Sequence, residues 1–261
     1  MMLVFLFILG LFIGSFLNVL IDRLPREEQI LFGRSHCDSC KHTLSWFDLV
    51  PVFSWCILGG RCRYCKRSIP SRNTLVELVT ALLFGYIAYA TVNPLPGLTE
   101  RVLLIAVLEC ILVASLLVIF VVDFQHQIIP DSMLVTAGIV ALILHIVSPL
   151  ADTYSWTNYV ASGLLASAFF LILHIGTKGR GMGLGDVKFA GFMGILLGYP
   201  DTLGTLYVAF LTGAVVSSML LIRHRKKLGQ TIAFGPFLVG ATLLSYFGFL
   251  DFVWRYLLAI G

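Results

Sequence analysis

Long apolar runs dominate the chain, and short polar segments separate them. A helix that crosses a bilayer needs about 17–25 mostly apolar residues. Runs of about this length cover residues 2–22, 75–92, 102–122, 133–150, 157–176 and 232–250. A further apolar stretch, 189–222, contains helix breakers and one charge: Gly198, Pro200, Asp201 and Gly204. This stretch can form either one helix or two short ones.

The first run, residues 1–21, lacks two features of a cleavable signal peptide. Its flanking basic residues, Arg23 and Arg26, follow the run instead of preceding it. It also has no small-residue cleavage site. We therefore expect a retained first span whose N-terminus lies outside.

Composition agrees with a membrane protein. The chain has 261 residues, of which 58% are hydrophobic and 12% charged, and its mean hydropathy is +0.93. A water-soluble core of this size could not bury so much apolar surface. The net charge of +4 would indicate acidic partners in a soluble protein. In a membrane protein, the topology of the chain explains this positive charge better, and no nucleic-acid partner is expected.

The basic residues predict the topology. Of the 18 Lys and Arg residues, 16 fall within 23–72, 178–188 and 223–227. Two helices in 189–222 place all three groups on one side of the bilayer, which the positive-inside rule makes cytoplasmic. The sequence thus predicts an all-α protein with about eight transmembrane helices. Its expected parts are a first helix (1–22), a cytoplasmic segment (23–74) and a membrane domain (75–261).

Four cysteines in the cytoplasmic segment have the spacing of metal ligands. Cys37-x2-Cys40 and Cys62-x2-Cys65 are two CxxC pairs, and each pair can place two thiolates on one tetrahedral metal. Disulfides are the alternative, which a cytoplasmic location disfavours. We expect a structural zinc ion, because four thiolates leave no open coordination position and a short segment gains folding energy from the metal. Two cysteines remain, with packing as their expected role: Cys56 and Cys110.

Two acids at the predicted cytoplasmic face are candidates for catalysis. Asp123 follows the run LLVIFVV at a helix C-terminus, where the helix dipole disfavours negative charge. Asp186 lies in GMGLGDVK, a glycine-rich turn before the next apolar stretch. Both acids are expected on the same side of the bilayer, at the ends of different helices.

Structural roles remain open for several charged residues. Asp131 follows Pro130 and is expected to be a capping or first-turn acid. Asp186 can likewise cap the helix that it begins. Glu77 can pair with Arg72 at the membrane face. A further charged residue, Lys188, either reaches the lipid headgroups or stabilises the Asp186 carboxylate.

A pair of carboxylates in one partly desolvated site can hydrolyse a peptide bond. The two groups cannot both ionise easily, so they share a proton. One can then take a proton from water while the other donates to the peptide carbonyl, as in aspartic proteases. Gly181, Gly183 and Gly185 would let a substrate backbone approach and let the loop change conformation. The sequence contains neither HExxH nor GxSxG, which leaves the carboxylates as the better catalytic set.

Six motifs in order resemble those of the type IV prepilin peptidase family, membrane aspartic proteases of the GxGD type. They are GSFLNVLIDRLP (14–25), DLVPVFSW (48–55) with GRCRYC (60–65), LVELVT (75–80), DFQHQIIPD (123–131), GMGLGDVK (181–188) and AFGPFL (233–238). The resemblance covers nearly the whole chain. One departure is Leu184 in GLGD, where another glycine is common and which GxGD permits.

The resemblance implies that Asp123 and Asp186 are the catalytic pair, which decides between Asp123 and Asp131. The supporting residues of the active-site loop are then Gly183, Gly185 and Lys188. Members of the family remove a short basic leader from prepilins and pseudopilins. They cut at the cytoplasmic side of the bacterial inner membrane, after a glycine and before a usually aromatic residue.

The resemblance also implies a second activity. Many members with the tetra-Cys segment methylate the new N-terminal amine with S-adenosylmethionine, and this chain has all four cysteines. Gly60 and Glu77 match family positions linked to methyl transfer. No GxGxxG nucleotide loop is present in the sequence, so the residues alone do not locate a site for the methyl donor.

Two other functions are compatible with parts of the sequence. A zinc-stabilised transporter or channel would carry protons on acids near the bilayer midplane, where only Glu109 is expected. A peptidase without methyl transfer is the other alternative.

Overall fold

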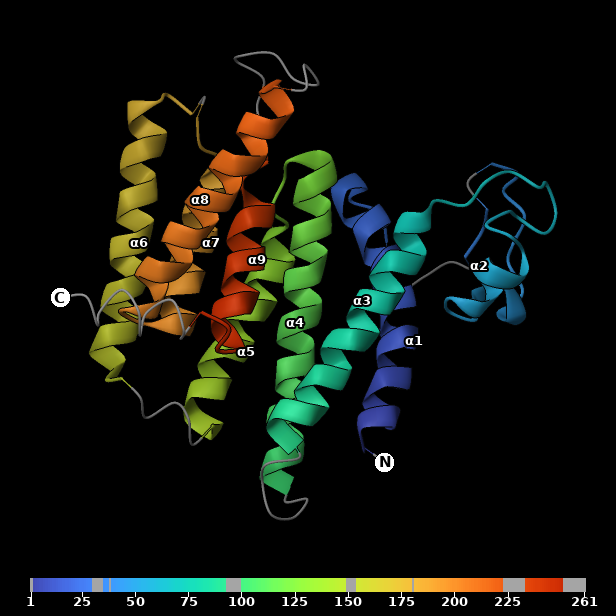
Figure 1. Ribbon diagram of the computed structural model, residues 1–261, viewed down its shortest axis with the longest axis horizontal. Helices are drawn as coiled ribbons and strands as arrows, with labels where there is room; N and C mark the ends of the chain where they lie inside the picture. Colours follow the sequence, from blue (N-terminus) through green and yellow to red (C-terminus); the bar gives the residue numbers. More distant parts are fainter. Residues whose placement is uncertain are drawn as a thin grey trace. The chain divides into compact units, whose positions relative to one another are not determined.

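The computed structural model describes residues 2–29, 35–37, 39–92, 100–148, 154–179, 181–222 and 233–250. Most of these residues are helical, as the apolar runs predict (Figure 1). The chain forms two compact units, 1–118 and 119–261, which divide within helix α4 (Glu100–His126). The expected division at residues 22 and 74 stays a prediction.

Each apolar run of the sequence contains a helix. Besides α4, these are α1 (Met2–Arg23), α3 (Ser71–Ile87) with a π-helical continuation η3 (Ala88–Val92), α5 (Asp131–Val147), α6 (Trp156–Gly176) and α9 (Gly235–Tyr246). The interrupted stretch forms two helices, α7 (Leu184–Leu197) and α8 (Asp201–Ile222). The two-helix alternative is therefore confirmed, with Gly198 and Pro200 between the two helices.

Several of these helices are suited to a membrane. Among the described residues, five are long and apolar enough to cross it: Met2–Arg26, Ser71–Val92, Glu100–His126, Trp156–Gly176 and Asp201–Ile222. The helices α5 and α9 are apolar but shorter. The chain is thus a multi-pass membrane protein, while the count of eight spans stays a prediction. The basic group 223–227 lies outside the described residues.

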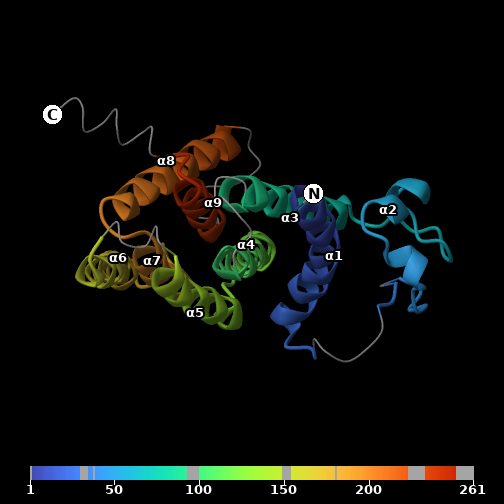
Figure 2. The same ribbon diagram turned by 90° about the horizontal axis from the view of Figure 1, so that it is seen from below.

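In the first unit, α1 packs directly against α3 (Figures 1 and 2). A Cβ atom added to Gly10 would lie 2.6 Å from the Cα of Ala81, and one added to Gly14 would lie 2.6 Å from the Cα of Glu77. The two glycines are four residues apart and share one face of α1, so the backbones meet there as in other close-packed membrane helices. This contact brings Glu77 against α1.

The segment between α1 and α3 has little regular structure. It contains the 3-10 helices η1 (Leu24–Arg26) and η2 (Trp46–Leu49), the short helix α2 (Phe53–Ile57), and two isolated antiparallel bridges. Such a short segment has few buried apolar residues, which is why a metal would matter for its folding.

In the second unit, α7 is the central helix. It contacts α5, α6, α8 and α9, and Figure 2 shows it between α6 and α5. A Cβ atom on Gly194 of α7 would lie 2.6 Å from the Cα of Gly163 on α6. These two helices therefore pack backbone to backbone, which fixes the position of α7 along α6.

Candidate functional site

Asp123 is a buried acid in the last turn of α4, with 5% of its surface exposed. The first residue of α9, Gly235, lies against it, and a Cβ atom at this position would collide with the Asp123 carboxyl group. The backbone N–H of Gly235 faces the carboxyl group, so the positive end of the α9 dipole is directed at this acid. Among the described residues, its Oδ2 atom has no hydrogen-bond partner.

Aromatic packing holds the start of α9 in this place. Phe234, directly before Gly235, has its ring centroid 4.9 Å from that of Phe210 on α8. The same ring lies 6.1 Å from that of Phe170 on α6. Two helices thus anchor the residue next to Gly235, and the approach of α9 to Asp123 follows from apolar packing.

Asp186 is a half-buried acid in the first turn of α7. Its Oδ2 atom accepts a hydrogen bond of 3.0 Å from the N–H of Gly183. Asp186 therefore does cap the helix that it begins, as the sequence allowed. The carboxyl group also interacts electrostatically with Asp123, so the second unit brings together the two acids that the sequence singled out.

The glycines of the turn before α7 have different surroundings. A Cβ atom on Gly185 would lie 3.2 Å from the Cβ of Ile129, in the segment that follows α4. At Gly183 the nearest atom would be the Asp186 Oδ2 at 3.4 Å, an ordinary contact, and the backbone φ of −76° suits any residue. Gly185 thus permits α7 to approach Ile129, a role that differs from the expected approach of a substrate.

Lys188 has a partner that the sequence did not predict. Its Nζ atom lies 2.8 and 2.9 Å from the two carboxylate oxygens of Asp131. The structure thus shows Asp131, and not Asp186, as the carboxylate that Lys188 contacts, while contact with the lipid headgroups stays a prediction. Asp131 is the first residue of α5, which confirms the expected first-turn position. The side chains of both partners are exposed, and their ion pair joins α5 to α7.

Two acids held at helix ends can perform proton transfers. Asp186 lies at the N-terminus of α7, and Asp123 faces the N-terminus of α9. Helix N-termini stabilise negative charge, while proximity of the two acids favours a shared proton. A buried carboxylate oxygen without a protein partner is available to a water molecule or to a substrate. The arrangement is thus suited to activating water beside a peptide carbonyl.

The four predicted metal ligands lie together in two similar knuckles. The Cys37 N–H donates to the His42 carbonyl and the Lys41 N–H to the Cys37 carbonyl. The second knuckle repeats this pattern, with Cys62 bonded to Arg67 and Lys66 bonded to Cys62. Lys41 and Lys66 have φ values of 56° and 59°. Each CxxC loop therefore makes the same tight turn, which directs both of its thiols to one point.

The sulfur positions fit a tetrahedral ion. All four Sγ atoms lie within 4.8 Å of one another, and those of Cys37 and Cys65 are 3.9 Å apart. Zn–S bonds of about 2.3 Å in a tetrahedron place the sulfurs about 3.8 Å apart. The four cysteines are free thiols, so disulfides do not explain the cluster.

The electrostatics of the cluster also favour a cation. Burial opposes ionisation of Cys37, but the N–H groups of Cys40 and Ser39 lower its pKa to about 7. At Cys65 the Arg67 N–H favours the thiolate, yet burial and the neighbouring thiols raise the pKa to about 11. Four thiols this close cannot all ionise at neutral pH by themselves, whereas a bound metal ion deprotonates its thiol ligands.

Asp48 supports the second knuckle. Its Oδ1 atom accepts a hydrogen bond of 2.7 Å from Nε of Arg63, and its Oδ2 atom one of 3.2 Å from the Tyr64 hydroxyl. Burial raises the energy of the carboxylate, but the Arg63 bond and the Ser45 N–H outweigh it and lower the pKa of Asp48. Asp48 thus ties η2 to the residues between Cys62 and Cys65.

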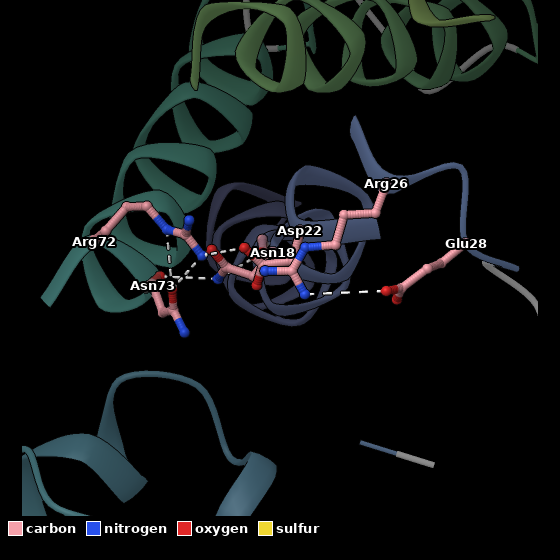
Figure 3. Close-up of polar contacts among 7 residues, drawn as sticks. Asn18, Asp22, Arg26, Glu28, Arg72 and Asn73 are labelled. Carbon is pink, nitrogen blue, oxygen red and sulfur yellow. Dashed lines mark hydrogen bonds and ion pairs between the residues drawn. The ribbon is translucent and has the colours of Figure 1, made fainter. Parts of the chain in front are cut away.

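Glu77 and Gly60, the candidates for methyl transfer, both lie in the first unit. Glu77 is 8% exposed, and its Oε2 atom accepts a hydrogen bond of 2.7 Å from the Val52 N–H. Arg72 does not pair with Glu77 as the sequence allowed, because its Nη2 atom lies 2.8 Å from Oδ1 of Asp22 (Figure 3). Gly60 has a φ of +68°, and a Cβ atom there would lie 2.9 Å from the Trp55 ring.

Of the six cysteines, two lie outside the metal cluster. Cys110 is buried in α4, as expected of a packing thiol, whereas Cys56 is exposed on α2.

The sequence did not indicate Gly235, Asp48 or Trp55 as residues of the site. The GP pair of AFGPFL marks a helix start, and this signal locates the start of α9 correctly. It does not indicate that the start meets Asp123. Gly235 meets Asp123 of another helix, Asp48 bonds to Arg63 and Trp55 bonds to the Ile69 carbonyl, and hydrophobic periodicity reports none of these contacts.

Comparison with known families divides the chain in two. Residues 8–91 match the bacterial peptidase A24 N-terminal domain, and residues 110–218 match the type IV leader peptidase family. No solved structure matches the chain.

Curated relatives are similar over most of the chain. A prepilin leader peptidase/N-methyltransferase of Myxococcus xanthus is 34% identical over 84% of this chain and 63% of the relative. A protein of the same name from Stutzerimonas stutzeri is 31% identical over 88% of this chain and 85% of its own length. One from Bacillus subtilis is 28% identical over 94% of both chains.

Proposed function

Because the chain belongs to the type IV leader peptidase family and is an enzyme, we propose that it is an aspartic endopeptidase with prepilins and pseudopilins as substrates. The observation that carries this proposal is the pairing of Asp123 with Asp186 within one unit, each at a helix end. The enzyme would cut the basic leader at the cytoplasmic face of the bacterial inner membrane. A substrate that keeps its apolar helix in lipid explains why the peptidase is a membrane protein.

The proposed reaction uses the two acids in complementary protonation states. The ionised aspartate takes a proton from a water molecule as the water oxygen bonds to the scissile carbonyl carbon. The protonated aspartate gives its proton to the carbonyl oxygen. When the tetrahedral intermediate collapses, the C–N bond breaks and the protonated aspartate gives its proton to the amine nitrogen. The ionised aspartate takes the proton of one hydroxyl group, so the carbonyl re-forms as a carboxylic acid and the acid pair again holds one proton.

The proposed second activity is N-methylation of the new N-terminal residue. The relatives are named for both activities, and S-adenosylmethionine would supply the methyl group. The amine nitrogen bonds to the methyl carbon as the carbon–sulfur bond breaks, and one proton is released to solvent. Zinc in the tetra-Cys cluster would have a structural role, since four thiolates complete its coordination.

Mass spectrometry of a prepilin incubated with the purified enzyme and S-adenosylmethionine tests both activities. We expect loss of the leader and addition of one methyl group to the mature N-terminus. Loss of the leader alone would support a peptidase without methyl transfer. An intact prepilin, combined with solute uptake by proteoliposomes, would support a transporter instead.

Gly235→Ala is expected to lower kcat for leader cleavage by about 100-fold, because a displacement of the reacting groups by about 1 Å can cost this much. The added methyl group would displace Asp123, since Phe234 holds the start of α9 in place. The KM for the prepilin is expected to change little. Steady-state kinetics with the purified variant measure both constants.

Gly240→Ala is the matched control for this variant. Gly240 lies on the same helix, and a Cβ atom there would meet nothing within 4 Å. Its kcat is expected to match that of the unmodified enzyme. Equal kcat values for the two variants would contradict the role assigned to Gly235.

A further inference from the structure

A histidine of the second unit contacts the turn before Asp186. His174 lies in the last turn of α6, and the turn joins the end of this helix to the start of α7 (Figure 1). The Nδ1 atom of His174 lies 2.7 Å from the carbonyl oxygen of Met182. A carbonyl oxygen only accepts hydrogen bonds, so Nδ1 carries a hydrogen atom and donates it. His174 belongs to none of the six sequence motifs.

The carbonyl that His174 contacts and the N–H that Asp186 accepts belong to one peptide group. This N–H is that of Gly183, and it donates to Oδ2 of Asp186 at 3.0 Å. The atoms of a peptide group lie in one plane, and in the trans form the C=O and the N–H point in opposite directions. A single rigid plane therefore connects the imidazole ring on one side with the carboxyl group on the other.

The two hydrogen bonds fix the orientation of this plane. Glycine permits many backbone conformations, so without the bond from His174 the plane could turn and the Gly183 N–H would leave Asp186. The Gly183 bond holds one oxygen of the Asp186 carboxyl group, and the direction of the other oxygen follows from it. The proposed reaction depends on that direction, because proton transfer needs a short and aligned contact.

The bond from His174 also strengthens the bond to Asp186. A carbonyl that accepts a hydrogen bond draws electron density from the peptide nitrogen, which makes the N–H a better donor. Hydrogen bonds in such a chain reinforce one another by about 10–30% per bond. The Gly183 N–H is therefore a stronger donor to Asp186 when His174 is in place.

Contacts within the turn hold both His174 and Met182. The N–H of Gly179 donates to the carbonyl oxygen of His174 at 2.9 Å. Gly179 has a φ of +72°, and a Cβ atom there would lie 3.3 Å from Cε1 of the His174 ring. Met182 is buried, with 8% of its surface exposed. The donor and the acceptor thus have little freedom to move apart.

We propose that His174 is a positioning residue for peptide cleavage. It holds the Met182–Gly183 peptide group, and this group holds the Asp186 carboxyl group in the orientation that pairs it with Asp123. The inference rests on the proposed catalytic role of Asp186. It adds a residue that touches neither the substrate nor the reacting atoms.

Kinetics of leader cleavage by two variants of the purified full chain test this role. His174→Phe keeps a ring beside Gly179 but has no donor, and it is expected to lower kcat by about 10- to 100-fold with little change in KM. His174→Asn has no ring, but its Nδ2 atom can take the place of Nδ1. It is expected to restore most of kcat, a rescue that a packing role of the ring would not give.

His145→Phe is the matched control. The Nε2 atom of His145 lies 2.8 Å from the carbonyl oxygen of Ile195, so this histidine also bonds to a backbone carbonyl of the second unit. Ile195 is near the opposite end of α7 from Asp186. The kcat of this variant is expected to equal that of the unmodified enzyme, and thermal unfolding verifies that each variant is folded.

The position of the ring proton gives a second measurement, made on the unmodified chain. Nitrogen NMR of the isotope-labelled protein reports which ring nitrogen carries the hydrogen atom, and the signal absent from His174→Asn identifies His174. A hydrogen atom on Nδ1 is expected. A His174 ring with its hydrogen atom on Nε2 alone would overturn the inference.

Asp186→Asn, measured alongside, separates this role from the proposed function. If Asp186→Asn is slow while His174→Phe cleaves at the full rate, the role of His174 is wrong and the proposed function stands. Equal losses in His174→Phe and His174→Asn would also contradict the role, because the donor would then not matter. If Asp186→Asn cleaves at the full rate, both are wrong. A slow His174→Phe, a faster His174→Asn and a normal His145→Phe support the role.

Discussion

Asp123→Asn and Asp186→Asn are each expected to slow leader cleavage by about 10²- to 10⁴-fold, the usual contribution of a group that transfers protons. Each change preserves the size of the side chain. In Asp186→Asn the new amide oxygen can still accept the Gly183 N–H at the start of α7, so the helix should remain in place. Cleavage rates of a prepilin by the purified variants, with thermal unfolding as a test of folding, give the measurement.

Asp131→Asn is the control for these variants. Asp131 is another acid of the same unit, but its side chain is exposed and pairs with Lys188. Exposed ion pairs contribute about 0–1 kcal/mol, so a rate close to that of the unmodified enzyme is expected. If either catalytic-site variant cleaved at the full rate, the assignment of the acid pair would be wrong.

Cys62→Ser is expected to release most of the zinc from the purified protein. Cys62 is the most buried of the four ligands, with 3% of its surface exposed. Structural zinc provides about 10–16 kcal/mol in zinc-finger peptides, and the short segment has no large core to replace it. Mass spectrometry of the metal content measures the loss, and faster proteolysis between residues 35 and 74 would show unfolding.

Cys56→Ser is the control for Cys62→Ser, because it removes a thiol of the same segment that is not one of the four proposed ligands. Cys56 lies in the same segment, is exposed and is not part of the cluster. Its zinc content is expected to equal that of the unmodified chain. A Cys62→Ser protein that retained zinc fully would contradict the tetrahedral site.

Features that depend on local sequence were predictable. Apolar runs located the helices, because a membrane helix must carry its own apolar length. The breakers around Pro200 correctly indicated two helices in place of one. CxxC spacing located the four-cysteine cluster, since the two thiols of each pair are neighbours in the chain.

Features that depend on packing between distant elements were not predictable. Hydropathy does not report that Gly235 meets Asp123 or that Lys188 pairs with Asp131 and not with Asp186. Each of these contacts depends on how helices that are distant in sequence are placed against one another. In a single sequence, such a contact is visible only as an isolated small or charged residue.

The contact between Gly163 and Gly194 has a consequence for the proposed peptidase. Because the two backbones meet there, Asp186 in the first turn of α7 is held at a fixed height along α6. Under the proposed function, a substrate helix would have to place its scissile bond at this height. The number of residues between that bond and the apolar helix of the substrate would then be constrained.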